Sequence, residues 1–499
     1  MSLTFIPITT LYYFSLKSNT YTNKPNKFLS VLLLAASCSA QALDVPDLFE
    51  DPLFSRPPVL DAGPTLPNDG APVPCPATKD FSLPLALGEA VDLALCNNPK
   101  IKMTWAGIKV QAGALGEARS AYLPTVSGTV SGLHNHTTFP GTTTPATSKD
   151  GDTLYASLSW RLLDFGGRAA NHELAEKLLE AALASHDAEL QKMLVSVIQA
   201  YFDAVTARAT LIARNEAVRI AQATLDTARR REASGAAPQS DTLQAVTALA
   251  HAALSQQRAQ GDNSKALAVL VQAMSVPTHT RVILPETMDE FHAETAKDLD
   301  TWIAEAEQRH PAIIAARAQW EAAGRKVSAV RSEGLPTLDF TANYYENGYP
   351  NQGLQATQTQ VSTVGLVLTV PLFEGFSRTY KVRGAQAQVE QREVELLDTR
   401  QQVLTEVVKA HADAVSSLVN LHSSGELLKA AQASQASSIR RYDKGAADVL
   451  EVLNTQSVLA EAGQERLRVM AEWRSARLRL MANAGALGRA MIGSAESSR

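Results

Sequence analysis

Residues 441–459 read RYDKGAADVLEVLNTQSVL, and they resemble a stretch 210 residues earlier, REASGAAPQSDTLQAVTAL at 231–249. Aligned without a gap, the segments share Arg231/Arg441, Gly235/Gly445, Ala236/Ala446, Ala237/Ala447, Leu243/Leu453 and Leu249/Leu459. Asp241 also aligns with Glu451. An internal repeat decides the architecture of a chain, so the question is whether this offset recurs elsewhere.

The offset recurs along most of the sequence. The further matches are Pro99 with Pro311 and Pro124 with Pro336 at 212, and Leu162–Arg168 with Leu372–Arg378 and Asp203 with Asp413 at 210. This agreement predicts a tandem duplication. We expect a first repeat at 85–277, a linker at 278–300, a second repeat at 301–484 and a C-terminal tail at 485–499.

The N-terminus has the features of an export signal. Lys24 and Lys27 precede the apolar run Phe28–Ala36, and Ala40-Gln41-Ala42 follows, which predicts a signal peptide at 1–42. A membrane anchor is the alternative, but the apolar run is short for a transmembrane helix. LAASC, ending at Cys38, resembles a lipoprotein site, and we rank acylation below ordinary cleavage. Ten prolines between Pro46 and Pro84 predict an extended arm at 43–84.

Composition and motifs limit the possible functions. The 499 residues carry a net charge of −5, which gives no support to nucleic-acid binding, and only 6% are aromatic. No HExxH, GxSxG or P-loop pattern is present, so we expect no enzyme, no cofactor and no metal centre. His134 and His136 are expected in a solvated loop rather than as metal ligands. Cys75 and Cys96 form a disulfide or remain two free thiols, and the sequence leaves both options open.

Each half predicts the same order of helices. Asn98-Pro99 and His310-Pro311 each open a helical stretch, and a helix of about 35 residues runs to a Leu-Pro-Thr. After two alternating segments comes a very long helix, at Arg168–Glu232 or Ser377–Asp443. A second helix follows each Gly-Ala-Ala turn, at Asp241–Met274 and Val449–Asn483. The long helices would extend about 100 Å, so they must pack side by side as coiled coils.

The alternating segments predict two β-hairpins. Thr153–Leu163 and Ser362–Leu372 alternate apolar and polar residues, and Thr125–Gly132 and Thr337–Tyr344 do so more weakly, with loops at 135–152 and 346–360. This pattern fits transmembrane strands and also a half-buried soluble sheet. The export signal favours the membrane. Four strands cannot close a barrel, and an open edge is not tolerated in lipid, so we predict a trimer with about twelve strands.

From about Leu85 to Gly485, this duplicated plan resembles the TolC family of outer-membrane channels. The resemblance implies an α+β membrane protein, in which a trimeric twelve-stranded β-barrel continues as a periplasmic α-helical coiled-coil barrel. It implies a homotrimeric channel-tunnel of a tripartite export system, with a periplasmic adaptor, an inner-membrane ABC transporter and an exported polypeptide as partners. The sequence most resembles the branch serving type I secretion of cyclolysin-like toxins. Drug or metal efflux and a non-pore periplasmic coiled-coil scaffold are the competing interpretations.

The resemblance also implies a periplasmic gate at the opening pair of segments. It assigns Tyr442 to the family's gate tyrosine, Glu451 and Asn454 to acidic positions facing the pore, and Ser240-Asp241 to their partners, beside turns at Gly235 and Gly445. Two residues depart from the pattern. Ala447 occupies the gate-arginine position and Asn454 replaces an acid, so we expect one carboxylate ring and compensation by Lys444 or Arg441. We expect Tyr442 to hydrogen-bond Asp241, which could alternatively serve only as a helix cap.

Overall fold

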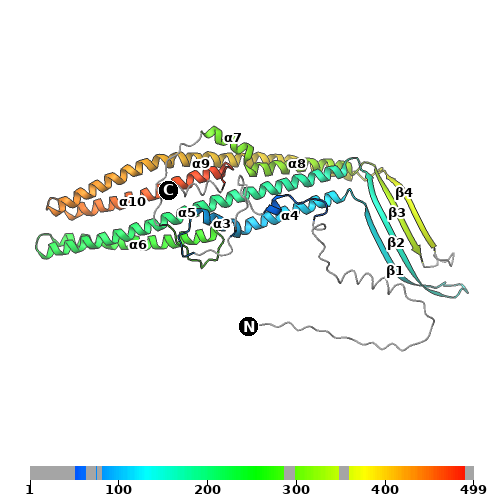
Figure 1. Cartoon of the computed structure of the whole chain (residues 1–499), viewed down its shortest axis with the longest axis horizontal. Coiled ribbons are helices and arrows are strands. Elements are labelled where there is room, and N and C mark those ends of the chain that lie inside the picture. Colours follow the sequence, from blue (N-terminus) through cyan, green and yellow to red (C-terminus); the bar gives the residue numbers. More distant parts are fainter. Residues whose placement is uncertain (1–50, 63–74, 76–80, 286–297, 348–358, 489–499) are drawn as a thin grey trace, which may run out of the picture. The chain divides into compact units, whose positions relative to one another are not determined.

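The computed structural model describes residues 51–62, 75, 81–285, 298–347 and 359–488. The predicted signal peptide with Cys38, most of the Pro-rich arm, most of the second loop and the end of the C-terminal tail lie outside these residues. Between residues 53 and 488, the described chain is mainly helical and contains one sheet of four strands (Figure 1). None of its described helices combines the length and apolar character needed to cross a membrane.

The helices of the two halves match in order and in length. The corresponding pairs are α3 (Leu87–Asn97) and α7 (Leu299–Arg309), α4 (Pro99–Ser120) and α8 (Pro311–Ser332), α5 (Gly167–Ala233) and α9 (Ser377–Asp443), and α6 (Gln239–Ala273) and α10 (Val449–Asn483). Their lengths are 11, 22, 67 and 35 residues in both halves. A short helix, α2 (Val59–Ala62), precedes them. The repeat in the sequence therefore corresponds to a repeat of elements, while the duplication event itself stays a prediction.

The helix predicted before each Leu-Pro-Thr is in fact two helices. Asn98 separates α3 from α4, and His310 separates α7 from α8, because the residue before a proline is disfavoured in helical conformation. Both residues are extended and cap the following helix. The Asn98 side chain accepts from the Lys100 amide at 2.9 Å, and His310 Nδ1 accepts from the Ala312 amide at 3.2 Å.

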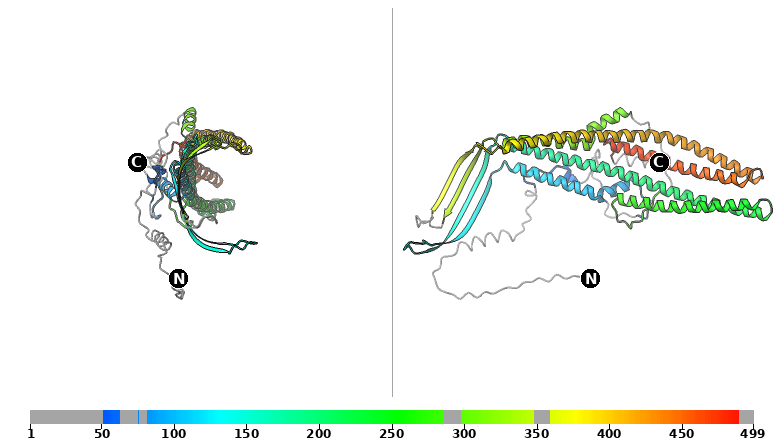
Figure 2. Two further views of the ribbon diagram at one scale, coloured as in Figure 1. Left: turned by 90° about the vertical axis from the view of Figure 1, so that its right-hand side faces the viewer. Right: turned by 180° about the vertical axis from the view of Figure 1, so that it is seen from behind.

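The helices form a layer in which α5 and α9 run the full length (Figure 1). Near the sheet they pack with α4 and α8, and toward the other end with α6 and α10. Viewed along their axes, these helices are arranged on an arc (Figure 2). The largest apolar cluster lies in the middle of α5, around Leu190, Leu194 and Val197. The matching positions of α9 are less buried: Val205 of α5 is 4% exposed, whereas its repeat partner Val415 is 43% exposed.

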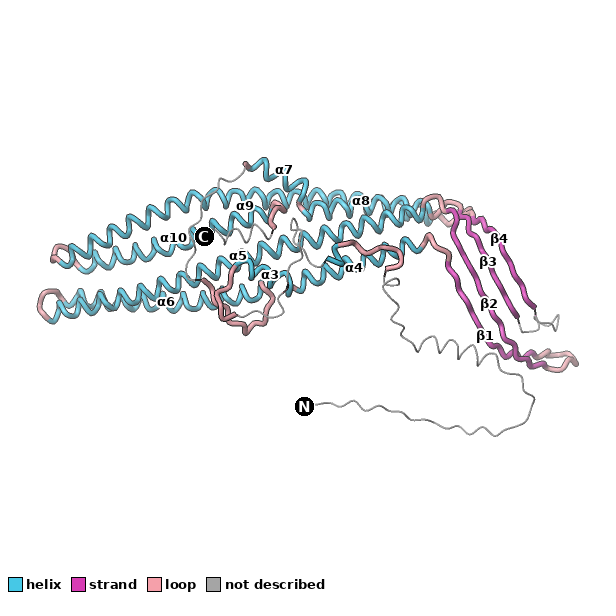
Figure 3. Tube along the Cα trace, viewed as in Figure 1, coloured by secondary structure: helices cyan, strands magenta, loops and turns pink. Residues whose placement is uncertain are grey.

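The sheet is antiparallel in the order β1-β2-β3-β4 (Figure 3). Its strands are β1 (Thr125–Thr137), β2 (Thr147–Leu163), β3 (Thr337–Asn347) and β4 (Thr359–Thr369). β1 and β2 extend into the predicted loop at 135–152, so the assignment of His134 and His136 to that loop was wrong. Both lie in β1, where His134 Nδ1 is 2.6 Å from Asp150 Oδ1 and His136 Nδ1 is 2.6 Å from Ser148 Oγ.

The motif LLDFGGR at 162–168 forms the junction between β2 and α5. The Asp164 carboxylate accepts from the Arg168 amide at 2.7 Å and from Arg168 Nε at 3.2 Å. The guanidinium also donates to the carbonyl of Arg161 at 2.6 Å and lies 5.0 Å from the centre of the Tyr122 ring. These contacts therefore fix the direction in which the chain passes from the end of β2 into α5.

The N-terminal arm is attached to the helices at two places. Cys75 and Cys96 form a disulfide, which joins the arm to α3. Earlier in the arm, Arg119 at the end of α4 donates to the carbonyl of Leu53 at 2.9 Å and to that of Phe54. Leu60 packs on an apolar cluster of α4 and α5. The part of the arm that the structure describes therefore follows the helical layer.

Candidate functional site

The two helical hairpins, α5–α6 and α9–α10, end in turns of the same geometry. Gly235 and Gly445 both have φ of 72°, in the left-handed region where glycine has no steric penalty. The amides of Ala236 and Ala446 donate to the carbonyls of Arg231 and Arg441, at 2.8 Å in both turns. This is the hydrogen bonding of a helix C-terminus closed by glycine. The repeated Gly-Ala-Ala therefore sets the shape of both tips.

Arg231 connects the two tips. Its guanidinium carbon lies 4.4 Å from the centre of the Tyr442 ring, and its Nη1 donates to the Tyr442 carbonyl at 3.3 Å. Tyr442 is only 7% exposed and packs with Val449 and Val452 inside the α9–α10 hairpin. A buried ring thus presents one face to a cation from the other hairpin, which is an attractive arrangement.

Arg441 occupies the repeat position of Arg231 but binds within its own hairpin. Its Nη1 is 2.6 Å from Glu451 Oε1, and its Nη2 donates to the Ala446 carbonyl at 3.2 Å. The carboxylate at the matching position of the first half is Asp241, which is one methylene shorter. Asp241 Oδ1 instead accepts from Ser240 Oγ at 3.5 Å. Arg231 is therefore directed across to Tyr442.

The structure brings together some of the predicted gate residues but not all. In the described part of the chain, the Tyr442 hydroxyl makes no hydrogen bond with Asp241, and a bond between two chains stays a prediction. Asp448, not Glu451, caps α10, since its carboxylate accepts from the Glu451 amide at 2.8 Å. Ala447 is half-buried beside the Tyr442 cluster, whereas Lys444 and Asn454 are exposed. Asp241 lies in the first turn of α6, whose N-cap is Pro238.

Toward the tips, the side-chain contacts between the two hairpins (the seam) are more polar than the hairpin interiors. Gln456 Nε2 donates to Thr224 Oγ1 at 3.3 Å, and farther along Arg214 bonds Gln464. Each of the two apolar clusters described near the tips stays inside one hairpin: Leu225, Ala228 and Ala245 in the first, and Tyr442, Val449 and Val452 in the second. The hairpins can therefore separate near the tips without breaking either cluster.

The sheet has one polar and one apolar face. On the polar face, Ser127 bonds Ser157 at 2.7 Å, Tyr155 donates to Asn343 at 3.0 Å, and Arg161 pairs with Asp339 at 2.9 Å. The apolar face includes Val126, Val364, Leu366 and Leu368, which are between 62% and 74% exposed. Exposed apolar side chains on this scale indicate a partner outside the chain, such as lipid.

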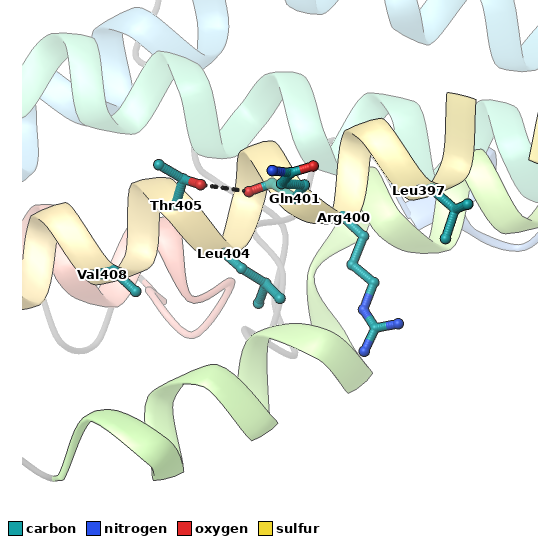
Figure 4. A pocket seen from close by; sticks show the side chains of 6 residues that line it. All are labelled: Leu397, Arg400, Gln401, Leu404, Thr405 and Val408. Carbon is teal, nitrogen blue, oxygen red and sulfur yellow. Dashed lines mark hydrogen bonds between the residues drawn. The ribbon is translucent and has the colours of Figure 1, made fainter. Parts of the chain in front are cut away.

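A shallow groove beside α9 is a second candidate site (Figure 4). It is lined by Leu397, Arg400, Gln401, Leu404, Thr405 and Val408. Arg400 pairs with Glu307 of α7 at 2.6 Å, and Trp302 of α7 packs on α9. Within the described residues, no group of three or more His, Cys, Asp or Glu side chains could hold a metal ion. Three of the six lining residues are apolar, so the groove offers a contact surface of mixed character.

His186 is buried between α4 and α5, far along the layer from the tips, and its neighbour Asp187 is half-buried. Burial lowers the pKa of His186 to about 4 and raises that of Asp187 to about 6. His186 Nδ1 is 2.8 Å from Thr104 Oγ1, and its ring lies against Trp105. His186 is therefore neutral at pH 7 and serves the packing of the helices.

The sequence missed Arg231 as a site residue. The available signal was its identity with Arg441 in the repeat, but that signal does not distinguish a contact within a hairpin from a contact between hairpins. The chemistry of the tips is that of a reversible contact. It includes a cation over a ring and an ion pair.

Comparison with known proteins agrees with this arrangement. The family described as outer membrane efflux protein matches twice, at residues 90–276 and 302–486. The chain is 35% identical over 438 residues to protein CyaE of Bordetella pertussis, which covers 84% of this chain and 88% of the relative. It is 24% identical over 417 residues to the proteases secretion protein PrtF of Dickeya chrysanthemi, which covers 81% and 88%.

The fold is likewise similar to that of a solved channel. The outer membrane protein VceC of Vibrio cholerae superimposes with a TM-score of 0.67 at 19% identity, over 80% of this chain and 96% of that one. This similarity and the two family matches agree with the observed combination of an open four-stranded sheet and long helical hairpins. The chain belongs to the outer membrane efflux protein family, the TolC-like outer-membrane channels with large periplasmic tunnels.

Proposed function

We propose that three copies of this chain form a continuous conduit across the outer membrane and into the periplasm. The open sheet is the observation that supports this most directly. β1 and β4 are its edges, and neither edge has a partner strand in the described chain. Hydrocarbon cannot satisfy the free backbone groups of such edges, so further copies must close the sheet. Three copies contribute about twelve strands, enough for a polar interior passage.

The edges of the helical layer support the same assembly. α9 forms one edge and exposes Val394, Leu397 and Val419, which are between 57% and 64% exposed. The opposite edge, formed by α4 and α6, exposes Met103 and Val110 at 68% and 67%, and Leu243 at 59%. Apolar rows on both edges of a layer fit copies that join side by side into a closed ring. Channels of this family work as homotrimers with adaptors and inner-membrane transporters.

For the cargo, we propose an exported polypeptide, and specifically type I secretion of a protein toxin. The sequence resembles the toxin-secreting branch, and its identity to CyaE exceeds its identity to PrtF by 11 percentage points (35% against 24%). PrtF is itself named for the secretion of proteases. The partners would be a periplasmic adaptor and an ABC transporter that supplies the energy. Drug or metal efflux is the second candidate, which the family description favours.

A periplasmic scaffold without a pore has less support. Such a scaffold would have no use for the exposed apolar face of the sheet, and the chain belongs to a family of channels. The members of that family are channels rather than enzymes. We therefore assign the tips of the hairpins the role of a gate. In this proposal the polar seam opens when partners displace one hairpin from the other, and Arg231 with Tyr442 holds it closed at rest.

The assembly can be tested on the purified protein. In detergent it should have the mass of three chains and insert into planar lipid bilayers as a conducting channel, because only the closed sheet satisfies its edges. Light scattering and single-channel recording measure the two properties. A stable monomer that keeps its full β-content in detergent would contradict the proposal.

The cargo can be tested by deleting the gene in its host. We expect one large polypeptide to disappear from the culture medium while tolerance to drugs and metal ions stays unchanged. Mass spectrometry of the medium and growth assays measure these outcomes, with the complemented strain as control. Unchanged secretion together with increased sensitivity to drugs or metals would favour efflux.

The latch can be tested by removing the cation over the ring. Arg231→Gln should weaken the closed state by about 1–2 kcal/mol per protomer and raise the resting conductance. Tyr442→Phe is the matched control, because it keeps the ring and the carbonyl that Arg231 contacts. Conductance should be unchanged in this variant. The opposite pattern would be a raised resting conductance in Tyr442→Phe and Asp241→Asn and an unchanged one in Arg231→Gln. It would show that the latch is a hydrogen bond between the Tyr442 hydroxyl of one chain and the Asp241 carboxylate of another.

The charge of the gate can be tested at Glu451. Three such carboxylates at a narrow aperture favour cations, and Arg441 neutralises part of that charge through its 2.6 Å ion pair. Glu451→Gln should therefore lower the cation-to-anion permeability ratio by about twofold, and Arg441→Gln should raise it. Reversal potentials in a salt gradient measure the ratio, with trimer yield as the control. Equal ratios in all three proteins would show that the constriction lies elsewhere.

A further inference from the structure

The β1–β2 hairpin continues beyond the part of the sheet that β3 covers (Figure 1). The pairing of β1 with β2 extends to Thr137 with Thr147, whereas β2 pairs with β3 only from Thr153 onward. In the described part of the chain, residues 132–137 and 147–152 therefore form a two-stranded extension, at the end of the sheet far from the helices. In a channel whose helices form a periplasmic tunnel, this end lies at the cell surface.

One face of this hairpin changes from apolar to polar along the extension. Val126 and Val130 of β1 belong to the apolar face of the sheet and are 74% and 51% exposed. His134 and His136 lie on the same face, because residues separated by an even number of positions along a strand share a face. Both histidines are exposed, and the His134 side chain is 64% exposed. The two imidazoles therefore follow the apolar residues of β1 on the outer side of the sheet.

Each of the two imidazoles is bonded through the same ring nitrogen to a residue across the hairpin. His134 Nδ1 is 2.6 Å from Asp150 Oδ1, and His136 Nδ1 is 2.6 Å from Ser148 Oγ. A carboxylate only accepts hydrogen bonds, so Nδ1 of His134 carries the proton, and Nε2 of the neutral ring keeps its lone pair. The Ser148 hydroxyl can accept as well as donate, so His136 can hold the same tautomer. Histidines that bind metal ions use this arrangement, because an acceptor on one ring nitrogen orients the ring and makes the other nitrogen more basic.

The charges beside the two imidazoles favour a cation over an anion. The Asp150 side chain is 87% exposed. Asp152, which pairs with Gly132 and lies two residues farther along the same face, is also exposed. Two carboxylates on one face repel phosphate groups and raise the local concentration of cations. Imidazole nitrogens suit Zn²⁺ and Cu²⁺, whereas Mg²⁺ and Ca²⁺ prefer oxygen ligands.

We propose that His134 and His136 form a binding site for a transition-metal ion, Zn²⁺ or Cu²⁺, at the cell-surface end of the β1–β2 hairpin. Residues two apart on a strand are separated by about 7 Å, which two imidazole side chains can bridge to share one ion at about 2.1 Å from each Nε2. Asp150 is a positioning residue, because it orients His134 through Nδ1. Among the described residues no third His, Cys, Asp or Glu completes a ligand group, so water completes the coordination and the ion exchanges with the medium. The binding of the ion depends neither on the cargo nor on the gate.

The site can be tested on the untagged protein purified from the outer membrane in detergent. Calorimetry measures the affinity for Zn²⁺, and the electron paramagnetic resonance of added Cu²⁺ counts the nitrogens bound to the ion. We expect one ion per chain with two imidazole nitrogens. His134→Gln and His136→Gln should each weaken binding by about tenfold or more, and Asp150→Asn by about tenfold with both nitrogens kept. His251→Gln is the matched control, because His251 is an exposed histidine of α6, and it should bind as the parent does.

Equal affinity in the parent, His134→Gln and His136→Gln would overturn the proposal, and so would a copper spectrum with a single nitrogen. Unchanged affinity in Asp150→Asn would contradict the positioning role of the carboxylate. A second measurement needs no substitution, because diethyl pyrocarbonate modifies imidazoles that hold no ion and mass spectrometry locates the modified residues. Zn²⁺ should protect His134 and His136 but not His251. Equal modification of all three histidines with and without Zn²⁺ would refute the site.

Discussion

The unsatisfied edges of the sheet are the constraint on which the rest of the molecule depends. A strand edge exposes backbone donors and acceptors, and hydrocarbon offers no partner for them. In the membrane the edges β1 and β4 need partner strands, and in the assembly that we propose other copies of the chain supply them. Closure then dictates the helices as well. Each of the long helices α5 and α9 is the next element after a strand, so its position follows that of the strand in the proposed barrel.

The matched lengths of the helices follow from this arrangement. The layer requires two helices of 67 residues to lie beside pairs of shorter helices of 22 and 35 residues. The shorter helices of the first half meet at the middle of α5, where α3 covers the break and the largest apolar cluster forms. The second half repeats this with α7 on α9, around Trp302 and Val407. Pro99 and Pro311 therefore mark the part of each half where an additional helix, α3 or α7, packs on the layer and makes it thickest.

Much of this organisation could be predicted from local patterns. The bounds of α9 and α10 were predicted correctly, because their limits are set by Gly445, by the junction motif and by the repeat itself. The start of a helical stretch at Asn98-Pro99 was predicted correctly, but the length of about 35 residues was wrong, because α3 is a separate helix that ends at Asn97. The hydrogen bond from Arg119 to the carbonyl of Phe54 and the contact of Arg231 with Tyr442 could not be predicted. They depend on segments that are 65 and 211 residues apart.

The two halves also show how a small difference gives equivalent residues different tasks. Arg231 and Arg441 occupy the same place before the same turn, and their backbone hydrogen bonds are alike. Arg441 finds Glu451 on the next helix and strengthens its own hairpin. Arg231 has only the shorter Asp241 at that position, and so its guanidinium reaches the Tyr442 ring of the other hairpin. Two arginines at equivalent positions therefore have different tasks: Arg441 holds one hairpin together, and Arg231 joins the two hairpins.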